Sequence, residues 1–340
     1  MDMRFEQVPL ANVPWAELDS FADRTVHQTK AWLAFLAETQ GAQPIVLQIF
    51  NAGEAVGWFT GATVQRFGLR ILGSPMRGWT TAHMGFNLVD DALIDSAVTG
   101  LAQYATSDLK CAHLEVLDQR CTRGVVPPGF KSTPLNGLVV DLQTDDEQLL
   151  LGMTKNGRRD MRKSLRSGVV VSEVDSNDSQ FVQEYYSQVS LAFARRGLAP
   201  TYPQSRVESM VRHLYPTGNL ILLRASLPTG ETAATGIFAG IPGGGASFTF
   251  QASDPDFYQW LPNEALVWQA LRAWRERGAL SFDFGGREIG SPTDFKRKFG
   301  GADLTTDWLR YSKYPLLESG RSLASRTHKA LQKRRKFRSG

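Results

Sequence analysis

A dense cationic segment lies near the middle of the chain, at residues 155–168. It holds six basic residues against one acid, and the glycine at its end is a typical helix terminator. Met153, Met161 and Leu165 recur at helical spacing, which predicts one apolar helix face. Like charges at this spacing repel one another, so acids elsewhere or an anionic ligand must compensate them. We favour the ligand, with phosphate contacts from Arg158, Arg159, Arg162, Lys163 and Arg166.

The C-terminal tail, residues 316–340, is a second cationic segment. It carries eight Lys or Arg residues against one acid, including the candidate phosphate contacts Arg334 and Arg335. The whole chain has a formal net charge of only +4, so the remaining residues are slightly acidic. Such a tail suits an anionic partner, either nucleic acid, anionic lipid head groups or a phosphorylated substrate. The alternative is a solvated, partly disordered end.

The elements that position these segments form a repeat. Each half shows a helix, then two strands joined by a turn, then a helix at apolar 3.6-residue spacing and a short strand. This order predicts one mixed α/β module used twice, although two generic hairpins could match by coincidence. The matching stretches are 28–38, 43–50, 55–64, 92–105 and 111–116 in the first half, and 179–195, 219–225, 232–241, 265–275 and 281–284 in the second.

Length and composition agree with two modules. At roughly 150 residues per domain, 340 residues predict a first module at 1–150, a second at 151–315 that opens with the basic helix, and the basic tail at 316–340. No apolar stretch approaches the roughly 18 residues of a membrane span, and the N-terminus lacks a secretory pattern. Two cysteines exclude a disulfide scaffold, and no metal-ligand spacing occurs. We therefore expect a cytoplasmic protein without a metal.

Several motifs resemble the Fem-family transferases, which are tandem GNAT-fold proteins. The basic helix resembles the arginine-rich helix that precedes their second module. The most specific element is Phe-Lys-x-x-Phe-Gly at 295–300, after a strand that ends in Asp-x-Gly-Gly at 283–286. Residues 258–268 and the Gln-x-x-x-Trp segment at 28–32 are also similar to the family. The resemblance covers roughly residues 5–315.

The resemblance implies a fold, a reaction and a set of site residues. Two GNAT modules would pack around a substrate channel. An aminoacyl group would pass from aminoacyl-tRNA to an amine of a peptidoglycan precursor or small metabolite, without a cofactor. Lys296 would stabilise the developing oxyanion, which is worth roughly 3–4 kcal/mol. The residues implied near substrate are His27, Gln28, Trp32, Tyr258, Trp260, Arg287 and Phe295.

Asp283 ends a buried-looking strand between two phenylalanines, where a carboxylate is costly unless it is paired. It would anchor Lys296 or Arg287, or accept a proton from the amine, and we favour anchoring. No nucleophile elbow occurs, so direct aminolysis is the simpler mechanism. Holding donor and acceptor in attack geometry supplies roughly 7–11 kcal/mol.

Two alternatives remain open. The first is an N- or O-acyltransferase that uses acetyl- or acyl-CoA on a sugar or lipid-linked intermediate. The sequence has no good copy of the Arg/Gln-x-x-Gly-x-Gly/Ala loop of such enzymes, because the glycine-rich run at 240–246 is expected to be a hairpin turn. The second is a non-catalytic binder of nucleic acid or of an anionic membrane surface.

Overall fold

The computed structural model describes residues 3–66, 68–121, 126–285 and 291–314, and the elements below belong to these ranges. The predicted hairpins are present at β2–β3 and β9–β10. The first half contains β1 (Met3–Gln7), α1 (Trp15–Leu18), η1 (Val26–Gln28), α2 (Lys30–Gln40), β2 (Gln43–Asn51), β3 (Glu54–Arg66), β4 (Leu69–Ser74), β5 (Gly85–Leu88), η2 (Asp91–Leu93), α3 (Ile94–Ser107), β6 (His113–Val116) and β7 (Phe130–Asp141).

The second half repeats the predicted order of helix, strands, helix and strand after two additional helices. It contains α4 (Asp146–Gly152), α5 (Lys155–Arg166), β8 (Val170–Glu173), α6 (Phe181–Ala194), α7 (Gln204–Leu214), η3 (Tyr215–Thr217), β9 (Leu220–Ser226), β10 (Thr232–Gly240), β11 (Gly245–Ser253), η4 (Pro255–Trp260), α8 (Pro262–Glu276), β12 (Ser281–Asp283), α9 (Ser291–Arg297) and β13 (Ala302–Ser312). The proposed boundary at residue 150 falls inside α4, and the domain limits stay a prediction.

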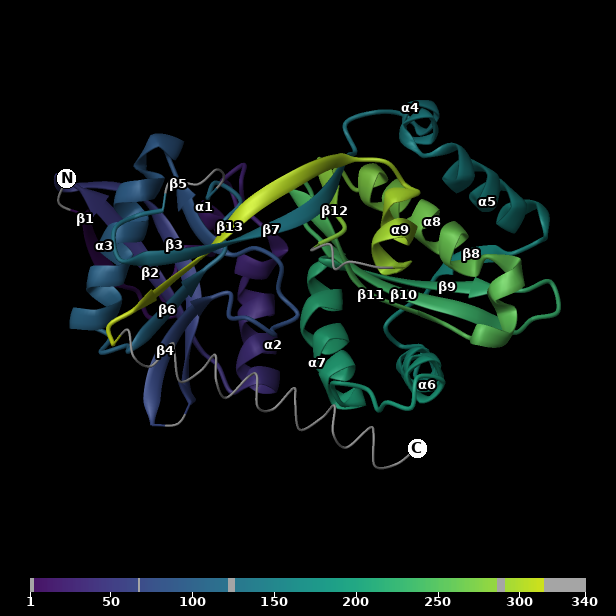
Figure 1. Ribbon diagram of the computed structural model, residues 1–340, viewed down its shortest axis with the longest axis horizontal. Coiled ribbons are helices and arrows are strands. Elements are labelled where there is room, and N and C mark those ends of the chain that lie inside the picture. Colours follow the sequence, from purple (N-terminus) through teal and green to yellow (C-terminus); the bar gives the residue numbers. More distant parts are fainter. Residues whose placement is uncertain (1–2, 67, 122–125, 286–290, 315–340) are drawn as a thin grey trace.

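The described strands form one mixed sheet that runs through both halves (Figure 1). Its order is β1-β2-β3-β4-β6-β13-β7-β12-β11-β10-β9-β8, with β5 paired to β3. The two halves of this order follow the same pattern when each is read from its own edge of the sheet. In each half, antiparallel strands lead to one parallel pair, which is β4 and β6 in the first half and β11 and β12 in the second. The repeated mixed α/β module predicted from the sequence is therefore present.

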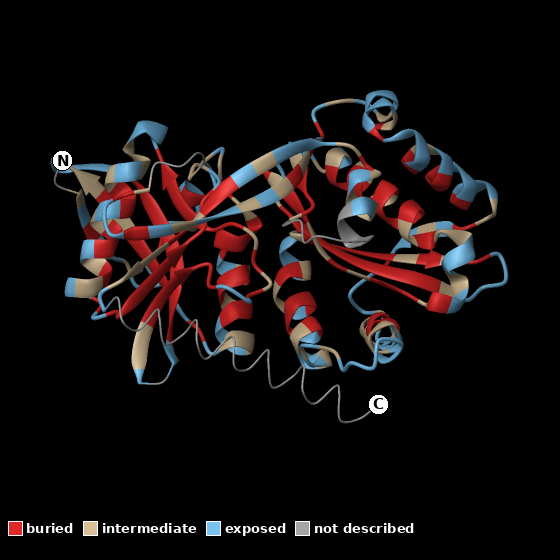
Figure 2. Ribbon diagram, in the orientation of Figure 1, coloured by how far each residue is buried: buried red, intermediate tan, exposed pale blue. Residues whose placement is uncertain are grey.

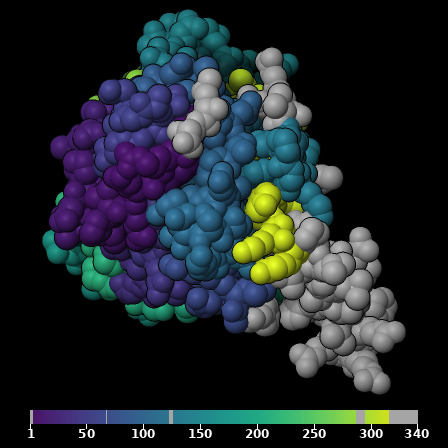
Figure 3. All heavy atoms as spheres, turned by 90° about the vertical axis from the view of Figure 1, so that its left-hand side faces the viewer, coloured from purple at the N-terminus to yellow at the C-terminus, as the bar shows by residue number. Residues whose placement is uncertain are grey.

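The two halves exchange their last strands at the centre of the sheet. β7 follows β6 in the chain but pairs with β12, whereas β13 follows β12 and pairs with β6. β7 and β13 also pair with each other, from Val139 opposite Ala302 to Phe130 opposite Tyr311. In Figure 3 the yellow end of β13 lies on the surface of the first half. Because of this exchange, paired strands at the centre of the sheet join the two halves.

A shared core joins the halves on one face of this sheet. Trp32 of α2 and Tyr185 of α6 belong to the same buried cluster as residues of α7. Figures 1 and 2 show α2 beside α7, with buried residues on the sides that face each other. At the edge of this contact, His213 Nε2 lies 2.7 Å from the Glu38 carboxylate, which Arg212 also contacts. Two further cores lie beneath α3 and α8.

Helix α5 forms where the sequence predicts it, but it presents a different face to the core. Met161 is buried, whereas Leu165 is 45% exposed, so its expected place on the apolar face was wrong. The reason is that Gly157 approaches the backbone of Lys298, while Asp160 pairs with the Lys298 ammonium at 2.9 Å. Lys298 Nζ also lies 2.7 Å from Glu264 of α8. Small and ionic residues therefore fix α5 in place.

We predict that Gly157→Ala destabilises the protein. A Cβ at this position would lie 2.1 Å from the Lys298 carbonyl oxygen, so α5 would have to move. Such overpacking costs roughly 1–3 kcal/mol, which exceeds the gain in helix propensity. Urea unfolding measures the change. Gly152→Ala is the matched control, because its Cβ would meet no atom within 4 Å. Equal stability of the two variants would contradict this account of how α5 docks.

Candidate active site

A cavity of about 90 Å³ lies where the two halves meet, and we call it the junction cavity. The first half contributes His27 from η1 and His83 from the loop before β5. The second half contributes Asp283 at the end of β12 and Ser247 from β11. The strand exchange brings these segments together, because β12 reaches the junction through its pairing with β7.

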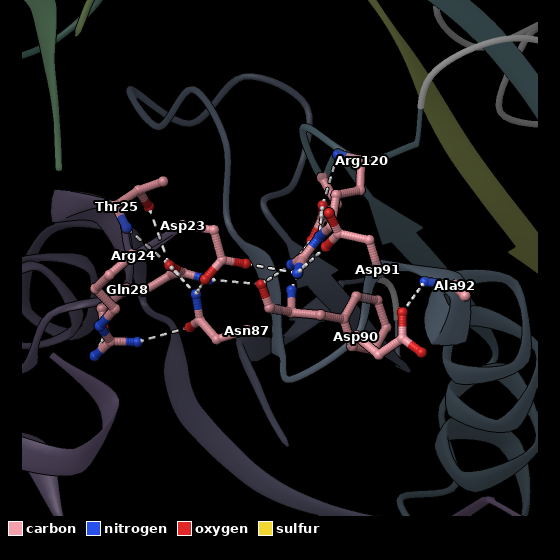
Figure 4. A network of polar contacts seen from close by, with 11 residues as sticks. Asp23, Arg24, Thr25, Gln28, Asn87, Asp90, Asp91, Ala92 and Arg120 are labelled. Atoms are coloured by element: carbon pink, nitrogen blue, oxygen red, sulfur yellow. Dashed lines mark hydrogen bonds and ion pairs between the residues drawn. The ribbon is translucent and has the colours of Figure 1, made fainter. Parts of the chain in front are cut away.

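A polar network fixes η1, the short helix that carries His27, through its neighbours Arg24, Thr25 and Gln28 (Figure 4). η1 starts with a capping box, in which the Thr25 backbone N–H donates to Gln28 Oε1 at 2.9 Å. The buried Arg24 guanidinium donates to the Gln28 carbonyl at 2.8 Å and to Asn87 Oδ1 at 3.2 Å. Thr25 Oγ1 donates to the His83 carbonyl at 3.1 Å. The same short helix therefore fixes both histidine-bearing segments.

Asp283 is a buried carboxylate with defined partners. Its Oδ1 accepts the Gly285 N–H at 2.6 Å, and its Oδ2 lies 3.4 Å from His83 Nδ1. Burial acts to raise the pKa of Asp283, but His83 and the Gly285 N–H outweigh burial, so the pKa lies below its ordinary value. The side chain is therefore an ionised acceptor at neutral pH.

His27 is a neutral imidazole at neutral pH. Burial and, to a smaller extent, repulsion from His83 lower the pKa of His27 to about 3. Its ring meets the Trp32 ring edge-on, with centroids 4.4 Å apart. Its Nδ1 has no hydrogen-bond partner among the described residues. The His27 ring therefore lines the cavity in its neutral form, with Nδ1 buried behind the cavity wall.

Sequence reasoning did not assign His83 to the site. Its Nδ1 lies 3.4 Å from Asp283 Oδ2 without hydrogen-bond geometry, and its Nε2 lies 3.4 Å from Thr306 Oγ1 on β13. An imidazole with a carboxylate beside one nitrogen can accept a proton at the other. No local motif marks His83, because both partners come from the second half. To identify His83 from the sequence, one would have to know that β7 pairs with β12 and β13, because this pairing brings Asp283 and Thr306 to it.

The other residues predicted to lie near the substrate do not gather at the junction cavity. Gln28 is buried in the network of Figure 4, and Trp32 is buried with its Nε1 donating to Thr81 Oγ1 at 3.0 Å. Trp260 packs against the second-half core, and Tyr258 is 49% exposed. Neither lines the junction cavity. Arg287 lies outside the described residues.

Lys296 and Phe295 belong to α9, beside the end of β12. Lys296 Nζ donates to the Phe284 carbonyl at 2.5 Å and lies 5.6 Å from the centre of the Phe248 ring. Phe295 meets Phe299 edge-on, with centroids 5.3 Å apart. Neither residue lines the junction cavity. The Lys296 ammonium is nevertheless anchored to the carbonyl of the residue that follows Asp283.

The predicted phosphate contacts of α5 divide into two groups. Arg158 donates to the Leu150 and Leu151 carbonyls at 3.3 and 3.0 Å, which ties α5 to α4. Arg159 pairs with Asp160 at 2.8 Å but stays exposed. The remaining candidates are exposed on the helix surface, namely Arg162, Lys163 and Arg166. Arg334 and Arg335 lie outside the described residues.

Two further cavities continue the junction cavity. One of about 180 Å³ shares Ala82, His83 and Leu304 with it, and we call it the apolar cavity. The other, of about 480 Å³, shares Val139, Ser281 and Leu304 and also includes Asp141 and Asp303; we call it the acidic cavity. The three cavities adjoin one another along β7 and β13, and we call this row of cavities the channel. Among the described residues, no group of His, Cys, Asp or Glu is arranged to hold a metal ion.

We predict that His27 makes stability depend on pH between 7 and 5. Its pKa is about 3 in the fold and about 6.5 when unfolded, so in this window only the unfolded state binds the proton. Stability should fall as pH falls, by about 2 kcal/mol at pH 5. Asp283 does not contribute to the change in this window. Its lowered pKa stabilises the fold above the unfolded value of about 4, and this stabilisation is lost only as the pH falls below that value.

Urea unfolding at pH 5 and pH 7 measures this change. The His27→Gln variant has no imidazole at this position, so its stability should fall less over the same interval. An equal loss in the variant and the wild type would contradict a neutral, buried His27.

Comparisons with known proteins agree with this architecture. Residues 153–297 match a family described as an acetyltransferase (GNAT) domain. Among solved structures, the chain is similar to FemX, with 15% identity, a TM-score of 0.72 and coverage of 92% of this chain and 99% of FemX. A search among curated proteins finds no match.

Two other solved structures are similar over the same length. A tandem GNAT protein from the clavulanic acid biosynthesis pathway has 11% identity, a TM-score of 0.54 and coverage of 92% and 99%. A conserved protein of unknown function from Bacteroides thetaiotaomicron VPI-5482 has 10% identity, a TM-score of 0.58 and coverage of 92% and 100%.

These matches support an acyltransferase at the level of superfamily. In the part of the chain that the structure describes, none of the helices combines the length and apolarity of a membrane span.

The family match and the similar solved structures together confirm the predicted fold, two tandem GNAT-like modules resembling the Fem transferases.

Proposed function

We propose that this protein is an acyltransferase that forms an amide by direct aminolysis. It transfers an aminoacyl group from aminoacyl-tRNA to an amine of a peptidoglycan precursor or small metabolite. The observation that carries the proposal is the buried His83–Asp283 pair in a channel built by both halves. The match of residues 153–297 to an acetyltransferase (GNAT) domain family, on a fold similar to that of FemX over 92% of the chain, supports acyl transfer.

The His83–Asp283 pair suits the proton transfer that aminolysis requires. As an amine attacks an ester carbonyl, it loses a proton while the acyl–oxygen bond breaks. His83 would accept this proton at Nε2, because Asp283 faces Nδ1 and stabilises the resulting imidazolium. His27 stays neutral beside it and adds no competing charge. The proton then passes to the departing hydroxyl.

Neither cysteine is suited to a covalent route. Burial raises the pKa of Cys111 to about 11, and burial together with Asp118 raises the pKa of Cys121 further. Both therefore stay thiols at neutral pH, whereas the thiolate is the nucleophile. Neither residue lines the junction cavity. This supports direct transfer without a thioester on the protein.

The proposed role of Lys296 is to stabilise negative charge on the acyl oxygen. Its ammonium is fixed to the Phe284 carbonyl, one residue beyond Asp283, so it lies next to the segment that carries the base's partner. An ammonium held by a carbonyl is already oriented, which lowers the cost of reorganisation during the reaction.

The helix N-termini that follow the two hairpins disfavour a CoA pyrophosphate. α8 begins with Pro262, which has no N–H, and its first turn carries Glu264, a buried acid. The corresponding α3 carries Asp95 in its first turn and follows η2, which Asp90 caps. A carboxylate at a helix N-terminus already interacts favourably with the helix dipole, which leaves that end less attractive to a phosphate. This supports a donor other than acyl-CoA.

The exposed cations of α5 supply a surface for a polyanionic donor. Arg162, Lys163 and Arg166 lie on the solvent face of the helix. Contacts of such side chains with RNA phosphates are largely independent of sequence and weaken with salt. They support tRNA as the partner.

The test of the donor is a coupled assay with charged tRNA and candidate amines. We expect amide product that RNase abolishes, because RNase separates the acyl ester from the RNA that the enzyme binds. Product formed with acetyl-CoA alone would overturn the donor and favour the CoA-dependent alternative. Absence of product with either donor would favour a non-catalytic binder.

Lys296→Met should lower the transfer rate by roughly tenfold or more with the fold intact, because an oxyanion cation is lost. Single-turnover kinetics measure the rate, and circular dichroism checks the fold. Lys313→Met is the matched control, since Lys313 is exposed. Near-normal turnover of the Lys296 variant would remove Lys296 from the mechanism.

A further inference from the structure

We infer that the apolar cavity holds the side chain of the transferred acyl group, and that this side chain is uncharged and about the size of a leucine or phenylalanine side chain. The inference rests on the proposed function and adds the class of acyl group. It is argued from the walls of the apolar cavity, its volume and its place in the channel.

The walls of the apolar cavity exclude a charged group. They include the indoles of Trp79 and Trp308 and the side chains of Met76, Leu117 and Leu135. Among its described lining residues, His83 is the one titratable side chain, and it already faces Asp283. An ionised side chain placed here would lose its hydration and meet only neutral polar groups, such as Thr81, Asn136 and Thr306, without an opposite charge among the described lining residues. Lysine, arginine, aspartate and glutamate side chains are therefore disfavoured.

The volume of the apolar cavity sets a lower limit on the group. Its volume of about 180 Å³ exceeds the roughly 150 Å³ of an engineered apolar cavity that binds benzene. A methyl group would leave most of the walls without contacts and would lose their dispersion attraction. A branched aliphatic or aromatic side chain fills the space better.

The place of the apolar cavity in the channel assigns it to the acyl group and not to the amine. It meets the junction cavity at His83, the proposed base. The acidic cavity, at the other end, contains the exposed carboxylate of Asp141, which suits an approaching cationic amine. The acyl carbonyl then lies between the two, next to His83. Trp79 and Trp308 also have indole N–H groups without partners among the described residues.

Two substitutions change the size of the apolar cavity in opposite directions. Gly137 lines it, and a Cβ there would lie no closer than 3.6 Å to any atom, so the Cβ of a Gly137→Val side chain meets no clash and we expect its methyl groups to narrow the cavity. Leu135→Ala widens it. Gly152→Val is the matched control, because Gly152 lies in α4 and lines none of the three cavities.

The experiment compares four neutral or acidic model compounds on the full chain. These are N-acetyl-phenylalaninamide, N-acetyl-leucinamide, N-acetyl-glycinamide and N-acetyl-glutamic acid amide, with binding measured by ligand-observed NMR. We expect the first two to bind roughly tenfold or more tightly than the others, because buried methylenes add to affinity and an ionised carboxylate loses its hydration in the cavity. Gly137→Val should reduce this preference, Leu135→Ala should favour the phenylalanine compound, and Gly152→Val should change neither.

Equal binding of the four compounds would overturn the inference, as would an unchanged preference in Gly137→Val. A general loss of folding cannot imitate the expected result. Gly137→Val should weaken the preference for the larger compounds, whereas Leu135→Ala should strengthen the preference for the phenylalanine compound. Failure of the proposed function is distinguished by the transfer assay. Absence of transfer with a retained binding preference would overturn the function, whereas transfer without the preference would overturn the acyl assignment alone.

Discussion

The contact between Asp283 and His83 is the interaction on which the site depends. Asp283 is 8% exposed and ionised, and a buried charge without partners costs several kcal/mol. Its partner lies on the other half of the chain, 200 residues away in sequence, so the two halves must stay in register for the charge to be compensated. The exchanged strands β7 and β13 fix that register through continuous backbone pairing.

Buried carboxylates also need a compensating charge at α5, and there a lysine supplies it. Asp160 of α5 and Glu264 of α8 share the Lys298 ammonium, so one cation joins two helices to the segment that leads into β13. Most cations of α5, namely Arg159, Arg162, Lys163 and Arg166, stay on the surface, where water screens their repulsion. A basic helix can therefore pack firmly through one ionic contact and a glycine while its outer face remains available to a polyanion.

The sequence predicted the local elements better than the site. Hairpins, the basic helix and the repeat follow from periodicity and turns, which are properties of neighbouring residues. Leu165 was placed wrongly because the docked face of α5 is set by Lys298, which lies more than a hundred residues away. His83 was missed because its partners, Asp283 and Thr306, reach it only through strand exchange. The roles of Lys296 and Arg287 stay predictions, and Arg287 lies outside the described residues.

The distribution of charge along the channel gives the proposed reaction a direction. Acids lie at one end, an imidazole–carboxylate pair in the middle and indole rings at the other end. An amine is attracted to the acidic end as a cation but must arrive at the carbonyl without its proton. A base at the midpoint removes the proton where the walls become apolar, because the charged form loses its stabilisation there. The gradient and the base therefore favour the same step, attack by a neutral amine.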